Sequence, residues 1–337
     1  MLELDGSHLE GGGQMLRTAL GLSAVTQQPF HMVHIRKGRT QPGVKEQHLQ
    51  AVNALQQLCD AKVRGAHLGS SEITFEPGKV KKGDVHVKIN TAGSVGLVLQ
   101  ALLIPALKTD LTITVEGGAT FGTQAMPVPH LEHVLLPLLA QMGYACTVDV
   151  TRHGFYPKGG AVVKVHSPKA GALKPLELME KGKLESLHGL SLASASLKNA
   201  RVAERQASEA SMLLLKEFKM PVKMKAVYDE TICPGSGIQL WAVTEHSVLG
   251  GNGLGERSKQ SELVGSEAAE RLIKAYHKGA VDSYTADQLL PYLALAGGGT
   301  IVTSEVTQHA RTNAFIIEKF LDARFTFQGT RIICAPK

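Results

Sequence analysis

The sequence predicts an α/β (α+β) fold made of three βαβαββ repeats, with a smaller α/β domain inserted in the third repeat. Three observations predict it. Short β-like runs alternate with amphipathic helices, the order of these elements recurs along the chain, and its third occurrence is interrupted. An inserted domain explains the interruption without a long structureless loop. The length of 337 residues is ample for a substantial core.

The first repeat is read from two helices and the strands around them. Leu16, Ala19 and Leu20 follow a helical period within residues 14–26, and a strand-like "FHMVHIRKG" comes next. Residues 44–58 form a second amphipathic pattern, and short β candidates follow at 62–66 and 72–76. This order predicts helices packed on a sheet.

The second repeat shows the same order. Its expected elements are a strand at 84–90, a helix at 92–107, a strand at 111–116, a helix at 128–142, and strands at 146–151 and 160–166.

The third repeat is assembled from two pieces. We expect its first strand near residues 187–194 and its remaining helix, strand, helix and two strands within 285–335. The stretch between them has its own helices at 203–218 and 261–276, and strands at 222–228 and 237–245. The approximate domain boundaries are therefore 1–184 for repeats one and two with the start of three, 185–279 for the inserted domain, and 280–337 for the rest of the large domain, which carries His309.

Composition limits the classes of function. The net charge of +6 favours an anionic partner such as nucleic acid or nucleotide, whereas 5% aromatic residues predict few stacking platforms for single-stranded nucleic acid. The four cysteines are far apart without metal-ligand spacing, which is typical of reduced thiols in a cytosolic protein. No signal peptide is evident, and the longest apolar run, 95–107, is too short to span a bilayer. We expect a cytoplasmic protein without a membrane partner.

The segment "LEGGGQMLRTAL" places three glycines directly before a helix. Glycines let a backbone approach a ligand closely, and a helix N-terminus offers free N–H groups to an anion. Gln14 and Arg17 share one helix face, and Glu10 is suited to a divalent cation that also binds substrate phosphates. A tight turn with a solvated Glu10 is an equally good interpretation of this segment alone.

A basic loop, "IRKGRTQPGVKEQHL", follows the second strand. Arg36 and Arg39 have the fork geometry that suits phosphate, although a solvated loop is the commoner explanation of any basic cluster. Gln47 and His48 open the next helix. His48 falls on the apolar side, which favours a satisfied core histidine over a ligand.

Two further helix starts carry polar residues. In "NTAGSVGLVLQ", Gln100 lies within an apolar helix and needs a partner, either a ligand such as a nucleobase or a backbone carbonyl. In "SYTADQLL", Tyr284, Asp287 and Gln288 lie at a helix start, where an acidic residue also stabilises the helix itself.

His309, in "VTSEVTQHARTNAFIIEKF", lies where a strand-like pattern changes to a helical one. Neutral imidazole is a competent nucleophile toward phosphorus near pH 7. A solvated or capping histidine explains the spacing better, because the chain has 14 histidines.

Taken together, these segments resemble the RNA 3′-terminal phosphate cyclase family in its catalytic, histidine-containing branch. The matching stretches occur in the family's order, and they are "LDGSHLEGGGQMLRTALGLS", "IRKGRTQPGVKEQHL", "GAHLGSSEITFEPG", "TAGSVGLVLQ", "HGFYPKGG", "SYTADQLL" and "VTQHARTNA". One departure is Ala161, where many relatives have a third glycine. The resemblance implies the same three repeats with an inserted domain, and also a homodimer.

The resemblance also implies a ligase-type reaction that uses ATP and Mg²⁺ or Mn²⁺. A histidine is adenylated, AMP passes to an RNA 3′-phosphate, and the neighbouring 2′-OH closes a 2′,3′-cyclic phosphate. Transferred to this chain, the nucleophile is His309 and the metal-binding residue is Glu10. The implied phosphate contacts are Arg17, Arg36, Arg39 and Gln47, and the implied nucleotide contacts are Gln100, Tyr284, Thr285, Ala286, Asp287 and Gln288, with Gln14 and Pro129 as weaker candidates.

Two alternatives belong to other classes of protein. A non-catalytic RNA-binding assembly protein, like the cyclase-like ribosome-biogenesis factors, is disfavoured by the presence of His309 with Glu10. An enolpyruvyl transferase also repeats a βαβαββ unit, but the segment around His309 disfavours it.

Overall fold

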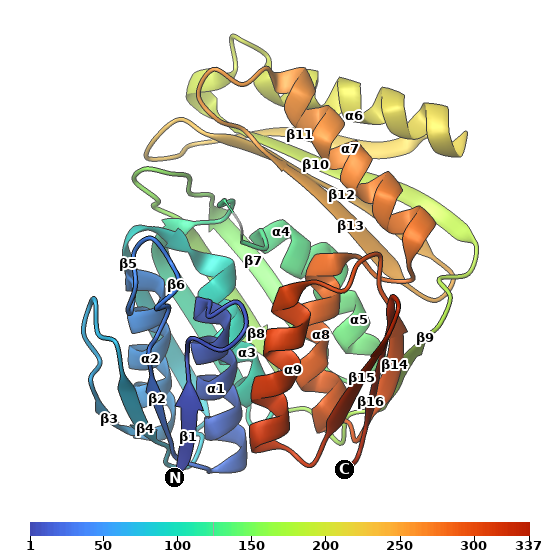
Figure 1. The fold of residues 1–337 in the computed structure, drawn as a ribbon. Coiled ribbons are helices and arrows are strands. Elements are labelled where there is room, and N and C mark those ends of the chain that lie inside the picture. Colours follow the sequence, from blue (N-terminus) through green and yellow to red (C-terminus); the bar gives the residue numbers. More distant parts are fainter. Residues whose placement is uncertain (124) are drawn as a thin grey trace.

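Three repeats of the same topology build the large part of the molecule, which the computed structural model describes over residues 1–123 and 125–337 (Figure 1). Their four-stranded sheets have the orders β1-β2-β4-β3, β5-β6-β8-β7 and, read from its first strand, β9-β14-β16-β15. In each sheet the first two strands are parallel, and the last two join by antiparallel pairing. The predicted α/β fold with three βαβαββ repeats is confirmed.

The first repeat follows the expected order. Its elements are β1 (Leu2–Asp5), α1 (Gly13–Thr26), β2 (Phe30–Val33), α2 (Glu46–Cys59), β3 (Lys62–Arg64) and β4 (Ile73–Glu76). Helix α1 begins without a side-chain cap at Gly12 and without an acidic residue in its first turn. Its first N–H groups are therefore available to a ligand.

The second repeat has the expected elements with one irregularity. They are β5 (Gly83–Ser94), α3 (Val95–Ala106), β6 (Leu111–Ala119), α4 (Val128–His130), a π-helical turn (Leu131–Leu135), α5 (Leu136–Gln141), β7 (Thr147–Arg152) and β8 (Val162–Ser167). The single helix predicted at 128–142 thus contains a π-helical turn, a feature often found at functional sites.

The third repeat corrects one prediction. Its elements are β9 (Leu176–Leu178), α8 (Ser283–Leu295), β14 (Gly299–Val302), α9 (Gln308–Phe320), β15 (Arg324–Gln328) and β16 (Arg331–Ala335). The prediction that residues 187–194 supply its first strand is wrong, because β9 is the strand that pairs with β14. A strand of only three residues is too short to show a period in the sequence.

The inserted domain lies between β9 and α8 and has its own sheet, ordered β11-β10-β12-β13. Its elements are β10 (Leu184–Ser194), a 3₁₀ turn (Ala195–Leu197), α6 (Val202–Phe218), β11 (Val222–Asp229), β12 (Ser236–Thr244), β13 (Val248–Leu254) and α7 (Ser261–Lys278). Helices α6 and α7 cover one face of the sheet, and a separate hydrophobic cluster fills the space between them (Figure 1). The strand expected at 187–194 is part of β10.

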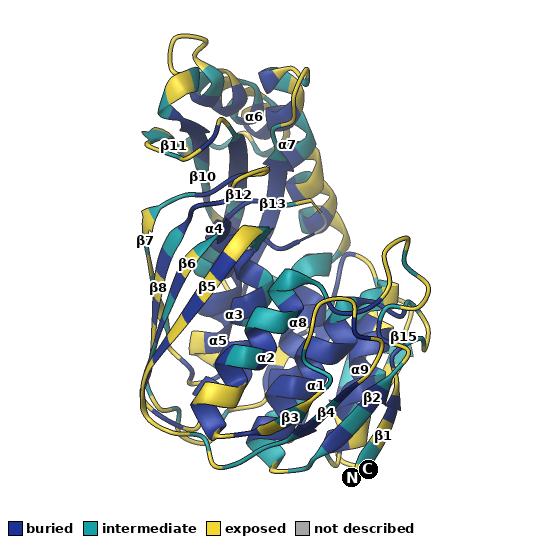
Figure 2. Ribbon diagram, turned by 90° about the vertical axis from the view of Figure 1, so that its left-hand side faces the viewer, coloured by how far each residue is buried: buried dark blue, intermediate teal, exposed yellow. Residues whose placement is uncertain are grey.

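Helices occupy the interior of the three repeats, and their sheets form the outside (Figure 2). Helix α1 packs against α3 and α9, and α8 packs against α9. Strand β5 alternates exposed and buried residues along most of its length, as expected for a sheet with one face in solvent. The start of α1 in the first repeat thus lies near the starts of α8 and α9 in the third. Within the described residues, no helix has the length and apolar character needed to cross a membrane.

Candidate active site

His309 lies in the first turn of α9, which Thr307 caps by accepting a hydrogen bond from the backbone N–H of Ala310 at 3.1 Å. Strand β14 ends at Val302, so the strand-like pattern before His309 does not hold this imidazole. Thr303, Val306 and Thr307 are β-branched residues typical of strands, but the backbone N–H groups of Thr303 and Ser304 donate to the carbonyls of Thr330 and Val281 instead of extending β14. The rigid first turn of a helix orients His309.

Glu10 faces His309 from the glycine-rich loop between β1 and α1. Its Oε2 lies 3.0 Å from Nδ1 of His309, and its Oε1 pairs with the Arg39 guanidinium. The Oε2 atom is buried and receives no well-aligned hydrogen bond from a described residue, despite the short separation from His309. His8 anchors the loop by stacking on Phe315 of α9, with 3.9 Å between ring centroids.

Arg17 is the buried cation of this site. Its Nε donates to Oε1 of Gln100 at 2.9 Å, so the partner required by Gln100 is a side chain of another repeat. Burial lowers the pKa of Arg17 to about 10, while the Asp287 carboxyl raises it and Arg36 lowers it further. The guanidinium stays charged at neutral pH, and its remaining N–H groups are available to an anion.

His48 completes this group in a way that its sequence position does not reveal. Its predicted burial is confirmed, and Nδ1 accepts the backbone N–H of Lys45 at 3.1 Å, which assigns the proton to Nε2. Nε2 lies 3.3 Å from Nη1 of Arg17, and both atoms are then donors. Two donors facing each other suit a shared anionic oxygen. Gly13 is required here, because a Cβ on it would lie 2.0 Å from Nε2.

Asp287 is the buried acid near Arg17. Burial raises its pKa to about 7, although hydrogen bonding from Gln288 and Gln14 and the charge of Arg17 lower it. Gln288 donates to Oδ1 of Asp287 at 2.6 Å. Gln14 lies close to this carboxyl but is not aligned for a hydrogen bond, and its buried Nε2 has no hydrogen-bond partner among the described residues. Asn313 of α9 donates to the backbone carbonyl of Asp287 at 2.7 Å, which joins α8 to α9.

Burial, helped by two nearby arginines, favours the neutral form of the His309 imidazole. Burial lowers the pKa of His309, the Glu10 carboxylate raises it, and Arg17 and Arg39 lower it further. Because Nδ1 faces Glu10, Nε2 is the nitrogen that does not face this carboxylate. The site therefore holds a neutral imidazole beside fixed cations.

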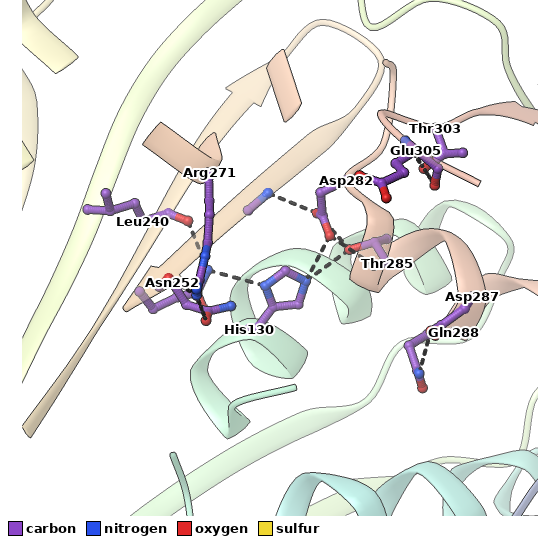
Figure 3. A network of polar contacts seen from close by, with 12 residues as sticks. His130, Leu240, Asn252, Arg271, Asp282, Thr285, Asp287, Gln288, Thr303 and Glu305 are labelled. Carbon is purple, nitrogen blue, oxygen red and sulfur yellow. Dashed lines mark hydrogen bonds and ion pairs between the residues drawn. The ribbon is translucent and has the colours of Figure 1, made fainter. Parts of the chain in front are cut away.

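The start of α8 is tied to the inserted domain by a buried polar network (Figure 3). Asp282 caps the helix by accepting from the backbone N–H of Thr285 at 2.9 Å, and it also accepts from the backbone N–H of Gly250 at 3.0 Å. His130 bonds with the Thr285 hydroxyl at 2.9 Å. This network fixes where α8 presents Asp287 and Gln288.

Of the other residues predicted at the start of α8, Tyr284 and Thr285 lie near His130 instead of beside His309. Tyr284 is half-buried, and its ring meets that of His130 edge-on at 6.0 Å, next to buried Pro129. The side chains of Thr285 and Ala286 are fully buried, and the Thr285 hydroxyl belongs to the network with His130. These two side chains do not join the group around His309.

Arg36 and Gln47 extend the site along the second loop. Arg36 donates to the carbonyls of Gln41 at 2.7 Å and Gly43 at 3.0 Å, so it shapes the loop while remaining close enough to lower the pKa of Arg17 and His48. Gln47 lies beside Gly93, on which a Cβ would be 3.3 Å from Oε1 of Gln47.

A small cavity lies behind Gln100 and Gln288. Its other lining residues are apolar or aromatic, and they are Leu103, Ile104, Met126, Leu131, Leu135, Pro291 and Tyr292. The cavity volume is about 10 Å³, which is room for one water molecule. It is too small for a nucleobase.

The residues fit a nucleotide phosphate and a divalent cation. The uncapped start of α1 and the cations Arg17 and Arg39 suit phosphate oxygens, as does the Gln14 amide donor, which has no partner among the described residues. The buried Oε2 of Glu10 is a free oxygen ligand, and Mg²⁺ often takes one carboxylate together with substrate phosphates. Across the described residues, no cluster of three or more His, Cys, Asp or Glu side chains forms an all-protein metal site.

Sequence reasoning left His48 and Asn313 outside the site. The signal for His48 was its position directly after Gln47, opposite the glycine-rich loop. Asn313 is fully buried and accepts from the Thr18 hydroxyl at 2.6 Å, and its spacing of four from His309 was the only available signal.

Comparison with known proteins gives one consistent result. A family model described as RNA 3′-terminal phosphate cyclase matches residues 8–327. A Methanopyrus kandleri protein named RNA 3′-terminal phosphate cyclase is 41% identical over 98% of this chain and 96% of its own. Proteins of the same name from Thermococcus kodakarensis and Caldivirga maquilingensis are 41% and 43% identical, over 97% and 96% of this chain and 95% and 93% of their own.

Proposed function

The chain is an enzyme of the RNA 3′-terminal phosphate cyclase family, and on this premise we propose that it activates an RNA 3′-phosphate with ATP through His309. The observation that carries the proposal is the convergence of His309 with Glu10 and Arg39 in one contact group, beside Arg17 and Asp287. These residues come from the first and third repeats, and Arg17 reaches Gln100 of the second. The shared site requires the whole fold.

In the first step, Nε2 of His309 attacks the α-phosphorus of ATP. A P–N bond forms, the bond from the α-phosphorus to the bridging oxygen breaks, and pyrophosphate leaves with that electron pair. The lowered pKa of His309 supports this role, because only the neutral imidazole has a free lone pair. Glu10 faces Nδ1, where positive charge develops as Nε2 bonds to phosphorus.

In the second step, an oxygen of the RNA 3′-phosphate attacks the same phosphorus and breaks the P–N bond. The RNA end then carries AMP. The vicinal 2′-OH attacks its own 3′-phosphorus, closes the ring and expels AMP, while its proton passes to a base. The hydroxyl is already close to phosphorus, which makes this step effectively intramolecular.

Arg17, Arg36, Arg39 and His48 are proposed to hold phosphate oxygens during these steps. Fixed donors in a partly buried site stabilise charge that develops on phosphate more strongly than water does. Gln47 is proposed to contact phosphate together with these residues. Gln100, Asp287, Gln288 and Tyr284, with Gln14 and Pro129 at the margin, are proposed to border the nucleotide. Thr285 and Ala286 are proposed to contribute through their backbone. A divalent cation on Glu10 would neutralise phosphate charge.

The proposed function is tested with three RNA oligonucleotides that differ only at the last ribose. RNA with a 3′-phosphate is expected to give ATP-dependent AMP release and an end resistant to phosphatase, and RNA with a 3′-OH is expected to give neither. A 3′-phosphate on a 2′-deoxy end is expected to accept AMP without cyclising. Equal AMP release from the 3′-OH oligonucleotide would contradict the proposal.

The pH dependence of self-adenylation is expected to follow His309. Neutral His309 is the nucleophile, so the rate should be constant above its lowered pKa and fall as the pH drops through it. Glu10 raises this pKa, so Glu10→Gln should move the acid limb to lower pH. Arg39 lowers it, so Arg39→Ala should move the limb to higher pH.

The measurement is the single-turnover rate of labelling against pH, normalised to each variant's plateau. Normalisation separates the position of the limb from the loss of rate that either substitution causes. Shifts of the same sign in both variants would show that the limb does not report His309.

A further inference from the structure

The loop between β7 and β8, residues 153–161, lies at the edge of the molecule that carries the active-site loops. Strand β8 is antiparallel to both β6 and β7, so β7 runs parallel to β6 and ends at the same edge. The ends of β5 and β6 lead into the starts of α3 and α4 at this edge. The loop contains the motif "HGFYPKGG", which the proposed chemistry at His309 does not use.

Many contacts hold this loop in one conformation. Phe155 is buried in a cluster with Phe121, Leu192 and Cys233 that spans the second repeat and the inserted domain. The backbone N–H of Gly159 donates to the carbonyl of Phe155 at 2.7 Å. A Cβ on Gly159 would lie 2.8 Å from the carbonyl oxygens of both Thr91 and Gly118, so the loop lies directly on strands β5 and β6.

Tyr156 projects from this fixed loop with 80% of its surface exposed. The side chain of the preceding residue, Phe155, packs into the hydrophobic cluster and anchors the loop, whereas no described residue stacks on the Tyr156 ring. Pro157 and Lys158 follow it and are exposed too. An aromatic side chain held rigidly in solvent beside a lysine is suited to stack on an unpaired base while the lysine meets a phosphate.

A continuous line of contacts joins this loop to the active site. His48 lies beside Arg17, and the next residue, Gln47, lies against Gly93 at the end of β5. Glu46 approaches the backbone and side chain of Asn90 at 3.5 Å. The carbonyl of Thr91 then meets Gly159 of the loop. An RNA strand that leaves Arg17 along this edge reaches Tyr156.

We propose that Tyr156 stacks on a base of the RNA upstream of its 3′ end, and that Lys158 contacts the adjoining phosphate. The proposal rests on the proposed function, because it takes the terminal phosphate to lie at Arg17 and His48. Stacking accepts any unpaired base, so recognition would depend on a single-stranded 3′ end and not on the internal sequence of the RNA. It provides one platform for a chain with few aromatic residues.

The test compares a ten-nucleotide 3′-phosphorylated RNA with a nucleoside 3′-phosphate, which has no upstream base to stack on Tyr156. Tyr156→Ala is expected to raise KM for the long substrate roughly tenfold, within the range that base stacking contributes, and to leave its kcat unchanged. KM for the nucleoside 3′-phosphate and labelling of His309 by ATP should not change. Tyr156→Phe keeps the ring and should behave like the parent protein.

The fluorescence of a modified base in the RNA reports stacking directly, and a general loss of enzyme activity would not change it. RNAs with 2-aminopurine placed at successive upstream positions should show one position quenched on binding, and Tyr156→Ala should abolish that quenching. Met212→Ala, also exposed at 56% but in the inserted domain, is the matched control. An unchanged KM for the long RNA in Tyr156→Ala, or an equal rise for both substrates, would overturn the proposal. Failure of ATP labelling in the parent protein would instead refute the proposed function.

Discussion

His309→Ala is expected to abolish covalent labelling of the protein by ATP that carries a radioactive α-phosphate. The alanine removes the nitrogen that is proposed to form the P–N bond. We expect no labelled band after denaturing electrophoresis, and a loss of RNA cyclisation of at least about a thousandfold, typical of removing a nucleophile. The fold should persist, because the side chain is 45% exposed.

His67→Ala is the matched control for this experiment. His67 is an exposed histidine on the β3–β4 hairpin, outside the contact group of His309. It should label like the parent protein. Parent-level labelling of His309→Ala would mean that another residue accepts AMP.

Arg17→Ala has the second largest expected effect. The substitution removes the guanidinium that donates to Gln100 and lies beside His48. It also removes a positive charge that lowers the pKa of Asp287. Loss of a fixed donor at a phosphate typically costs roughly a hundredfold in rate or more. The pKa of Asp287 should rise above about 7, so a larger fraction of this acid is protonated at neutral pH.

Arg17→Lys is expected to recover little of this loss, because an ammonium cannot reproduce the fork that meets Gln100 and an anion together. The measurement is the single-turnover rate of adenylation at saturating ATP. Arg311→Ala is the control, since Arg311 lies on α9 over the ring of Phe327 and away from the site. Full activity in Arg17→Lys would show that charge alone is needed at this position.

Periodicity located the long elements well but missed the strands that lack a period. The helix expected at 44–58 is α2, Glu46–Cys59, because its apolar residues face a core on one side. Strand β13 has the sequence "VLGGNGL" and was not predicted. Gly251 and Gly253 lie under α7, where a Cβ would be 2.5 Å from the carbonyl oxygen of Ala268 and 2.3 Å from that of Val264, respectively. Close helix packing selected glycine there and removed the strand signal.

The candidate site was predictable as a set of residues and not as a set of contacts. Gly-rich and basic segments are one signal of an anion site, so Glu10, Arg17 and Arg39 could be named as candidates. The pairing of Glu10 with His309 joins residues at opposite ends of the chain. Such contacts depend on how α1 and α9 meet, which no local pattern records.

The pairing of β9 with β14 affects the order in which the chain folds. Leu176 pairs with Gly299, so the third sheet closes only after the whole inserted domain has been made. The two ends of that domain meet at its β12–β13 turn. There the backbone N–H of Glu245 donates to the carbonyl of Lys183 at 2.9 Å, and the hydroxyl of Ser247 donates to the carbonyl of Ala280 at 2.6 Å. A folded insertion thereby shortens the effective loop that must close.

Repeats one and two have no such delay, because their strands pair with near neighbours in the sequence. Short-range pairings form faster than long-range ones, and a chain made from its N-terminus completes them first. The anion-binding loops would then exist before the third repeat docks. His309 is expected to arrive last, so that catalytic competence appears only when the fold is complete.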